Sequence, residues 1–216
     1  FKHYLNVVRI VRPKVFVFEN VKGILSMKAG DIFREIVSVF TDPSNFDGDH
    51  YNISYKIAKA VEFGIPEKRE RVIIIGILNK SINLEDMLEN TRQQVLEQYP
   101  YFFDDVTIRD AILGLPAPTE NGIINNPPPL NPYQEYLRCG KKILYNHKAT
   151  THTAIAVSRM HRIHDGQNWT SLDEEIHSVH SGAYGRMSWN EPSATITTRF
   201  DTPSGGRFTH PDEDRT

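Results

Sequence analysis

Two short, uninterrupted apolar runs constrain the fold of this chain more than any other feature. Residues 15–18 (Val-Phe-Val-Phe) and 72–76 (Val-Ile-Ile-Ile-Gly) have the length and composition of buried strands, which read as continuous hydrophobic runs. Polar residues border both runs. Glu19 and Asn20 follow the first run, and Arg71 immediately precedes the second. Ligands of α/β sheets bind outside strand ends. We therefore expect these polar residues to serve chemistry rather than packing.

Patterns around the two runs predict an α/β fold. Residues 1–11 show the apolar spacing of a helix, and Asp31 is placed to cap a second helix whose apolar stripe runs to Phe40. Residues 51–57 alternate between apolar and polar and predict a strand, a short helix follows, and residues 71–78 predict the next strand. Strand, helix and two further strands amount to half of an α/β sheet.

The sequence changes character after residue 78. Pro and Asn dominate residues 115–136, which predicts an irregular segment. Regular elements become fewer, with helices predicted at residues 83–99, 107–113 and 153–163 and an extended segment at 194–199. We therefore place a domain boundary near Leu115, which divides an α/β domain (1–114) from a smaller, irregular domain (115–216).

Composition is that of an ordinary soluble protein. The 216 residues can bury a core, and the single Cys139 excludes a disulfide framework. No apolar stretch approaches the ~20 residues of a membrane span, so we expect a cytoplasmic protein. Phe1 lies inside a helical pattern, and Thr216 ends the chain in the middle of a motif. These two ends predict a piece of a larger protein.

Charge is distributed unevenly, although the net charge is only −2. Residues 138–164 contain no Asp or Glu and carry four histidines. The cations of this stretch are Arg138, Lys141, Lys142, Lys148, Arg159 and Arg162. Such a stretch suits a surface that contacts phosphates, but on charge alone an ordinary solvated basic face has equal weight. The histidine spacing lacks a compact ligand set, so no metal site is predicted.

Several segments match the motifs of one enzyme family in order. Residues 12–23 contain Glu19, Asn20 and Val21 after an apolar run, and residues 64–71 contain two arginines one residue apart. Residues 184–198 and 210–216 follow. These segments resemble the Glu-Asn-Val motif, the Gln-x-Arg-x-Arg motif, the target-recognition region and the opening of the next motif of the prokaryotic DNA (cytosine-5) methyltransferases. Because the motifs share the family's order and spacing, the resemblance is specific.

Two family motifs that lie upstream of Glu-Asn-Val do not occur, namely the catalytic Pro-Cys dipeptide and the Gly-rich cofactor loop. Cys139 lacks a preceding proline, and we interpret it as an incidental thiol. The resemblance implies the second half of a Rossmann-like methyltransferase sheet plus an irregular target-recognition domain. S-adenosylmethionine would be the cofactor of the full-length enzyme, bound mostly by residues upstream of Phe1. This chain alone could lack the cofactor and should be inactive.

The resemblance assigns roles to the polar residues at the strand ends. Glu19, followed by Asn20, would approach N3 of a flipped cytosine as a proton donor, and burial would favour its protonated form. Arg71 would face the cytosine, where a guanidinium suits developing charge on O2, and Arg69 would orient the nucleophile. From the residues alone, Glu19 could instead cap a turn, and the arginines could form a surface cluster with Glu67.

DNA contacts are expected from the C-terminal segments. By resemblance, Thr195 is the Thr of the family's Thr-Leu or Thr-Ile pair, and arginines suit guanine or phosphate. The candidate contacts are Thr195, Thr197, Arg186, Arg199, Arg207, Lys141 and Lys148. For each isolated arginine, a solvated charge is the alternative. Two departures from the family pattern, Glu67 in place of Gln and Lys59 in place of Asn, put the local hydrogen-bond network in doubt.

The implied function is part of a restriction-modification DNA (cytosine-5-)-methyltransferase that acts on duplex DNA. The alternative is a DNA-binding specificity subunit that pairs with a separate catalytic chain, and a non-enzymatic interaction module has the least support. The expected partners are double-stranded DNA and the missing N-terminal half or separate subunit, with no membrane. The strand at 15–18 would lack its usual neighbour, and an exposed edge favours self-association.

Overall fold

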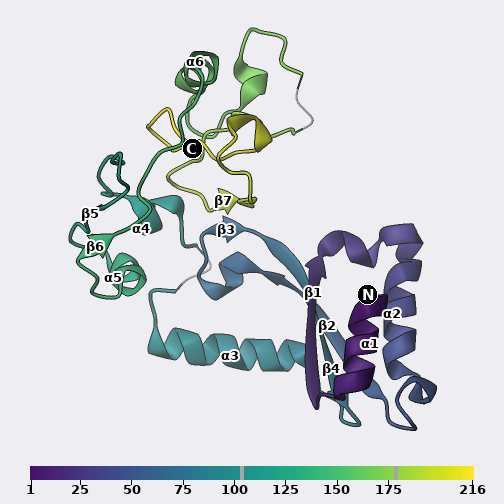
Figure 1. Ribbon diagram of the computed structural model, residues 1–216. Coiled ribbons are helices and arrows are strands. Elements are labelled where there is room, and N and C mark those ends of the chain that lie inside the picture. Colours follow the sequence, from purple (N-terminus) through teal and green to yellow (C-terminus); the bar gives the residue numbers. More distant parts are fainter. Residues whose placement is uncertain (103–104, 178–179) are drawn as a thin grey trace. The chain divides into compact units, whose positions relative to one another are not determined.

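The computed structural model describes residues 1–216 except 103–104 and 178–179, and it shows a mixed α/β protein with two compact units (Figure 1). The sheet unit comprises Phe1–Lys59 and Glu70–Tyr99, and the loop-rich unit comprises Ala60–Arg69 and Pro100–Thr216. Residues 60–69 therefore belong to the loop-rich unit, although both of their flanks in the sequence belong to the sheet unit. The functional domains predicted from the sequence, 1–114 and 115–216, rest on the change in sequence character near Leu115 and not on the division into two compact units. They stay a prediction.

The sheet unit contains a three-stranded antiparallel sheet. Its order is β1 (Val15–Val21), β4 (Glu70–Leu78) and β2 (Tyr51–Lys59), with β4 in the centre. The strands predicted at residues 51–57 and 71–78 are confirmed as β2 and β4, and they pair antiparallel. Within the described residues β4 is the only strand paired with β1, so the outer edge of β1 carries no strand.

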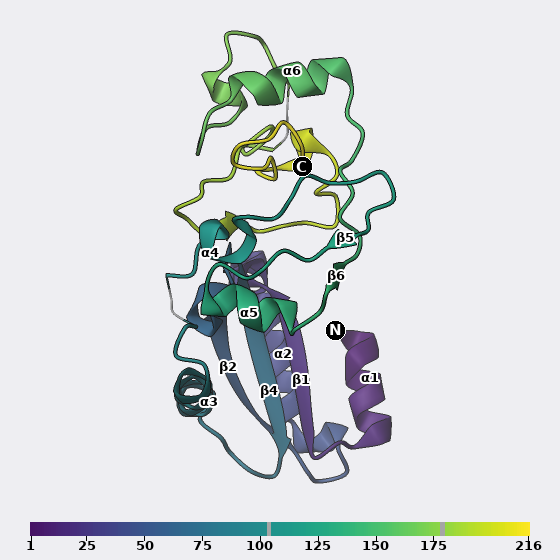
Figure 2. The same cartoon turned by 90° about the vertical axis from the view of Figure 1, so that its left-hand side faces the viewer.

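One face of this sheet packs against two helices. The helices α1 (Lys2–Val11) and α2 (Asp31–Thr41) cover the face that presents Phe16 and Ile74 (Figure 2). Phe16 stacks on Phe40 of α2, with ring centroids 4.6 Å apart. Gly76 lies opposite Phe16 in the ladder, and a Cβ there would be 2.2 Å from the Phe16 ring. The bulky phenylalanine thus requires a glycine on the neighbouring strand.

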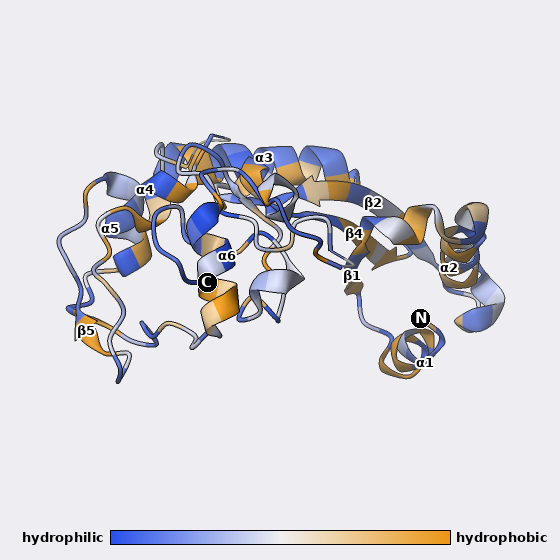
Figure 3. Ribbon diagram, turned by 90° about the horizontal axis from the view of Figure 1, so that it is seen from above, coloured by the Kyte–Doolittle hydropathy of each residue, from blue (hydrophilic) through white to orange (hydrophobic). Residues whose placement is uncertain are grey.

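The opposite face of the sheet is covered by α3 (Leu84–Gln98) only beside β2, where Lys56 pairs with Glu85 at 2.6 Å. Figure 3 shows α3 as a mainly hydrophilic helix. Beside β1 the same face is open. Apolar side chains stay half exposed or more on β1 and on α1, namely Val7, Ile10, Val11, Val15, Val17 and Val21. The sheet unit therefore presents an uncovered apolar surface at its β1 side.

Two details of the sheet unit differ from the sequence prediction. β1 extends to Val21 rather than ending at Phe18, because residues 19–21 continue the ladder with β4. Glu19 and Asn20 consequently lie within the strand and not beyond it. Asp31 does not cap α2: Gly30 holds the cap position with a φ of 87°, and Asp31 pairs with Arg34 at 2.7 Å.

The other helices of the sheet unit are as predicted. The helix expected at residues 1–11 is α1, whose C-cap is Arg12 in the left-handed region. The helix expected at 83–99 is α3, capped by the Asn83 side chain, which accepts two backbone N–H groups. Amphipathic spacing was the signal that predicted both helices.

The loop-rich unit contains short helices joined by long irregular segments. Its helices are α4 (Ile108–Ile112), α5 (Pro132–Arg138) and α6 (Ala154–Arg162). Two-residue ladders pair β3 (Glu67–Lys68) with β7 (Ser193–Ala194) and β5 (Ile124–Asn125) with β6 (Ile143–Leu144). The helices predicted at 107–113 and 153–163 are confirmed, with Thr107 and Thr153 as caps.

Two predictions in the loop-rich unit are wrong. Residues 115–136 are not wholly irregular, because α5 begins at Pro132, where the Asn131 side chain caps the helix by accepting the N–H of Gln134. The extended segment expected at 194–199 is a strand only at Ser193–Ala194. Glu67 and Lys68 offer just two partner residues there, so the ladder cannot continue to Arg199.

A buried arginine, Arg186, holds the loop-rich unit together. Its side chain is 5% exposed, and it pairs with Asp214 at 2.7 Å. The same guanidinium donates hydrogen bonds to four backbone carbonyls, those of Met160, Ile163, His210 and Glu213. Three separate parts of the chain thus meet at one side chain. This cluster replaces the strand ladders that the unit largely lacks.

Candidate functional site

Glu19 and Arg71 meet on neighbouring strands of the sheet unit. Glu19 lies on β1, and Arg71 lies diagonally across on β4, opposite Val21. Arg71 Nε is 2.9 Å from Glu19 Oε1, and Arg71 Nη1 also donates to the carbonyl of Glu70 at 2.8 Å. The structure therefore brings together the two residues that carry the first and second sequence motifs. Both side chains point to the sheet face that α3 leaves open beside β1.

The burial expected for Glu19 is not found. Its side chain is 51% exposed, whereas that of Arg71 is 22% exposed. The physical reason is the longer β1, which places Glu19 in line with Val17 and Val21 on the uncovered face. Asn20 points to the other face, and its Oδ1 accepts the backbone N–H of Val21 at 2.8 Å. In this chain alone, the Glu19 carboxylate is half exposed and pairs with Arg71.

The segment leading to Arg69 lies in the loop-rich unit and contacts the predicted recognition segment. Ser193 donates from both its backbone N–H and its hydroxyl to the carbonyl of Pro66, at 2.8 and 3.1 Å. The Thr195 hydroxyl donates to the carbonyl of Lys68 at 3.0 Å. Two motifs more than 120 residues apart in sequence thus form one junction. No pattern in the sequence predicts this pairing, since a two-residue ladder is too short to show periodicity.

The two departures from the family pattern take part in ordinary contacts. Glu67 Oε1 accepts the backbone N–H of Ile196 at 2.8 Å, and Arg69 Nη1 lies 3.9 Å from the same oxygen. A glutamine would offer an equivalent amide oxygen to Ile196. Lys59 lies opposite Glu70 in the β2–β4 ladder. The altered positions therefore keep a hydrogen-bonded local structure.

An open groove in the loop-rich unit contains several of the predicted DNA-binding residues. It consists of two adjoining pockets that share Thr197 and Gly205. Arg199 and Thr202 line one pocket, and Thr195 lines the other. Neither set of described lining residues includes Asp or Glu. Within the described part of the chain, the exposed Arg199 side chain has no recorded hydrogen bond or ion pair, so the groove offers hydroxyls and a free guanidinium.

Two other predicted DNA contacts are engaged within the fold. Arg186 is buried and has the five partners described above. Arg207 Nη1 donates to the carbonyls of Gly166, Gln167 and Arg186, at 2.5, 2.8 and 3.0 Å. Isolated arginines can be solvated, bound to a ligand or bonded to backbone, and sequence alone does not separate the three. We retain Arg207 as a groove residue and leave Arg186 out of the proposed interface.

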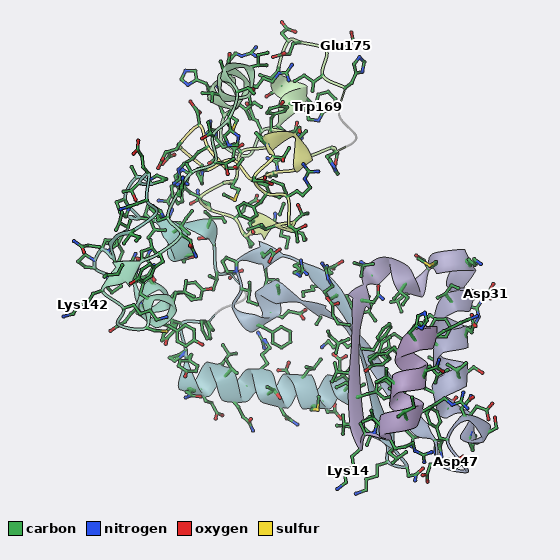
Figure 4. All side chains as sticks on the ribbon, viewed as in Figure 1. Lys14, Asp31, Asp47, Lys142, Trp169 and Glu175 are labelled. Atoms are coloured by element: carbon green, nitrogen blue, oxygen red, sulfur yellow. The ribbon has the colours of Figure 1, made fainter. Side chains whose placement is uncertain are left out.

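Part of the positive charge of the acid-free stretch 138–164 is neutralised by Glu174, which lies outside the stretch. Arg159 and Arg162 both pair with Glu174, and hydrogen bonds from these two arginines hold the pKa of the Glu174 carboxyl below its usual value. Three lysines of the stretch remain exposed with no ion pair among the described residues, namely Lys141, Lys142 and Lys148. The Lys142 side chain extends away from the fold (Figure 4). Lysines rather than arginines thus supply the free charge.

The described residues contain no group of three or more His, Cys, Asp and Glu side chains that could hold a metal ion. Cys139 is exposed. Around the Glu19–Arg71 pair, the open sheet face presents valines and lacks the Gly-rich backbone turn that a nucleotide cofactor needs. The residues present therefore do not form a cofactor pocket by themselves.

The fold of this chain matches that of a solved structure. An Escherichia coli prophage-encoded protein, described as a DNA modification methyltransferase, has a crystal structure that superimposes with a TM-score of 0.63 at 21% identity. The match covers 99% of this chain and 59% of that chain. The chain thus has the fold of a methyltransferase over nearly its whole length. A membrane-spanning helix was sought in the described residues, and none is long and apolar enough.

The family follows from the sequence. Residues 1–216 match the family of C-5 cytosine-specific DNA methylases, and the chain belongs to this family. The type II methyltransferase M.DdeI of Desulfomicrobium norvegicum is 31% identical over 81% of this chain and 41% of its own length. M.AquIA of Picosynechococcus is 34% identical over 54% of this chain and 49% of its own length. The chain spans about half the length of the curated relatives that it matches.

Proposed function

We propose that this chain is the part of a restriction-modification DNA (cytosine-5-)-methyltransferase that holds a flipped cytosine and recognises duplex DNA. The observation that carries the proposal is the 2.9 Å contact between Glu19 and Arg71, which joins the two family motifs on adjacent strands. In this proposal the sheet is the second half of a Rossmann-like methyltransferase sheet. Residues 115–216 form the target-recognition domain.

The proposed chemistry uses both side chains on one edge of the base. When a thiolate adds to C6 of cytosine, negative charge develops around N3 and O2 and needs stabilisation. Arg71 offers forked donors that remain charged in any environment and suit O2, while Glu19 faces N3. Asn20 fixes the backbone beside Glu19 through its bond to Val21. Arg69, two residues before Arg71, orients the nucleophile contributed by the rest of the enzyme.

The methyl donor is not bound by this chain alone in our proposal. S-adenosylmethionine supplies an electrophilic methyl group to C5 when it is bound in the complete enzyme. The residues of this chain act before and beside that transfer, since they hold the base and balance its charge. We therefore expect the isolated chain to bind DNA without methylating it.

The uncovered apolar surface of the sheet unit supports a missing partner. Val17 and Val21 of β1 are 56% and 53% exposed, and Ile10 of α1 is 83% exposed. Large apolar patches at a free strand edge are normally covered. We propose that the N-terminal half or a separate catalytic subunit covers this surface, and that the isolated chain self-associates through it. The complete enzyme is proposed to be cytoplasmic, as in a prokaryotic restriction-modification system.

Methyl transfer to duplex DNA tests the enzymatic proposal. The chain alone should incorporate no labelled methyl groups, whereas the chain produced with the rest of its reading frame should incorporate them. Arg71→Lys in that enzyme should lower the rate by about 10²-fold or more, since one stabilising donor contributes about that much. Glu70→Gln, which weakens the exposed ion pair between Glu70 and Lys22, is the control. Incorporation of methyl groups by the chain alone would contradict the proposal that the nucleophile and the methyl donor are held by the rest of the enzyme.

The same assay separates the enzyme from its alternative. If the complete reading frame has no Pro-Cys dipeptide, activity should appear only when a separate catalytic chain is added, which would support the specificity subunit. If neither arrangement methylates DNA but the chain binds it, the function is recognition without catalysis.

Duplex binding tests the recognition part directly. We expect salt-dependent binding by fluorescence anisotropy, with the slope of log affinity against log salt falling by about one unit for Arg199→Ala or Lys148→Ala. Lys80→Ala is the matched control, because Lys80 is an exposed lysine of the sheet unit. Equal losses for Lys80 and Lys148 would show that binding is unspecific electrostatics and not recognition by the loop-rich unit.

A further inference from the structure

One carboxylate oxygen of Glu67 contacts both the arginine motif and the predicted recognition segment. Its Oε1 accepts the N–H of Ile196 at 2.8 Å and lies 3.9 Å from Arg69 Nη1. The Glu67 side chain is only 18% exposed, so water competes little for this oxygen. Hydrogen bonds to a charged acceptor are shorter and stronger than neutral ones. The carboxylate therefore anchors the start of the segment 196–199 beside the arginine motif.

Neighbouring bonds fix the segment that carries Glu67. The Tyr133 hydroxyl donates to the carbonyl of Gly64 at 2.8 Å, and burial raises the pKa of that hydroxyl to about 12. A Cβ at Gly64, whose φ is 73°, would lie 2.9 Å from the Phe102 side chain. Pro66 and Lys68 accept the bonds from Ser193 and Thr195 described above. Glu67 is thus held on a rigid support and can position whatever it binds.

Among the residues that the structure describes, the segment beyond Ile196 has no comparable support. Residues 197–199 are exposed, and their recorded hydrogen bonds are local ones, in which the carbonyls of Thr197 and Arg199 accept from residues 200 and 202. The Glu67 contact is therefore the last bond between this segment and the rigid support. Arg199 follows three residues later and lines the acid-free groove.

We propose that Glu67 is a positioning residue that holds residues 196–199 where Arg199 reaches DNA, and so ties DNA recognition to the arginine motif. The proposal rests on the proposed function, because it requires that Arg199 contacts the duplex. The proposal assigns a role to Glu67, the residue that stands where the family pattern has Gln. The essential property is the acceptor oxygen for Ile196, which glutamine also provides.

A double-mutant cycle on duplex binding tests this coupling. Arg199→Ala should weaken binding about tenfold in the wild-type background, and Glu67→Ala should weaken it by a similar factor. If Glu67 acts through Arg199, the double variant should bind within about twofold of Glu67→Ala alone. Glu67→Gln should restore binding to within about twofold of the wild type, and the Ile196 amide should exchange slowly in this variant but rapidly in Glu67→Ala.

The control variant is Glu191→Gln at the same junction. It breaks an exposed ion pair with Lys68, in which Glu191 is 60% exposed, and should leave both binding and Ile196 exchange unchanged. Urea midpoints read by tryptophan fluorescence should agree among all variants, which separates positioning from unfolding. Additive losses in the cycle, or a Glu67→Gln variant as weak as Glu67→Ala, would overturn the coupling. A wild-type chain that binds no duplex would instead refute the proposed function itself.

Discussion

The two units are stabilised in different ways. In the sheet unit, nine buried apolar side chains form one core, and the polar residues proposed for catalysis are mounted on its strands. In the loop-rich unit, the main apolar cluster has five buried residues, and Arg186 joins its segments through backbone carbonyls and Asp214. Rigid strands position chemistry well, whereas loops supply varied recognition. If the two proposed roles are correct, the catalytic geometry and DNA recognition depend on separate kinds of interaction.

The largest effect that this comparison predicts is at Arg186. Arg186→Ala removes the ion pair with Asp214 and the hydrogen bonds to four carbonyls, and breaking a buried pair typically costs about 3–5 kcal/mol. Because both tryptophans, Trp169 and Trp189, belong to the loop-rich unit, their fluorescence in a urea titration reports on that unit alone. We expect its midpoint to fall sharply. Arg199→Ala is the matched control and should not move the midpoint.

A smaller effect is expected in the core of the sheet unit. Gly76→Ala forces a methyl group into the Phe16 ring, and overpacking of this kind costs about 1–3 kcal/mol. Gly23→Ala is the control, because a Cβ there meets nothing within 4 Å. Far-UV circular dichroism should show the loss for Gly76→Ala, while the tryptophan transition stays near its wild-type midpoint. Equal shifts of both signals would show that the units unfold together, and the comparison would fail.

The smallest effect concerns pH and the loop-rich unit. Burial, with the Arg215 charge second, lowers the pKa of His210, and burial also lowers the pKa of His152. A histidine that is kept neutral by the fold takes up a proton more readily when unfolded. Its contribution to stability is therefore complete above the ordinary histidine pKa and is lost as pH falls from there toward the lowered value.

The tryptophan midpoint should thus fall on acidification from pH 7 to pH 5, and His210→Asn should reduce that fall. His210 Nδ1 accepts the N–H groups of Asp212 and Glu213, and the asparagine oxygen can replace it as an acceptor. His164→Asn, at an exposed histidine, should leave the pH dependence unchanged. A fall of the same size in the His210 variant would assign the effect to His152 or to the carboxylates instead.

Most of the sheet unit could be predicted from the sequence, because its signals are periodic. The apolar runs identified β1 and β4, and amphipathic spacing identified α3. The failures at its edges have physical causes. Strand β1 continues through polar residues because β4 offers hydrogen-bonding partners as far as Arg71. The hydropathy of one segment carries no information about which strand pairs with it.

The loop-rich unit was less predictable, because its contacts are between single polar atoms. Capped helices such as α6 were visible, but the bond from Ile196 to Glu67 joins positions far apart in sequence and has no period. The same limit applies to arginines, since Arg186 and Arg199 look alike in sequence. Only the structure separates the buried Arg186, with its carbonyl partners, from the exposed Arg199 in the groove.

The central claim is that Glu19, Arg71 and the loop-rich unit belong to an enzyme that methylates C5 of cytosine at a chosen site. Bisulfite sequencing of DNA from cells that express the complete reading frame, or this chain with its separate catalytic subunit, tests it most directly. The account predicts 5-methylcytosine at one position of one short sequence, and its loss on Arg71→Lys. Unmethylated cytosines throughout, or equal methylation by the Arg71→Lys variant, would contradict the account.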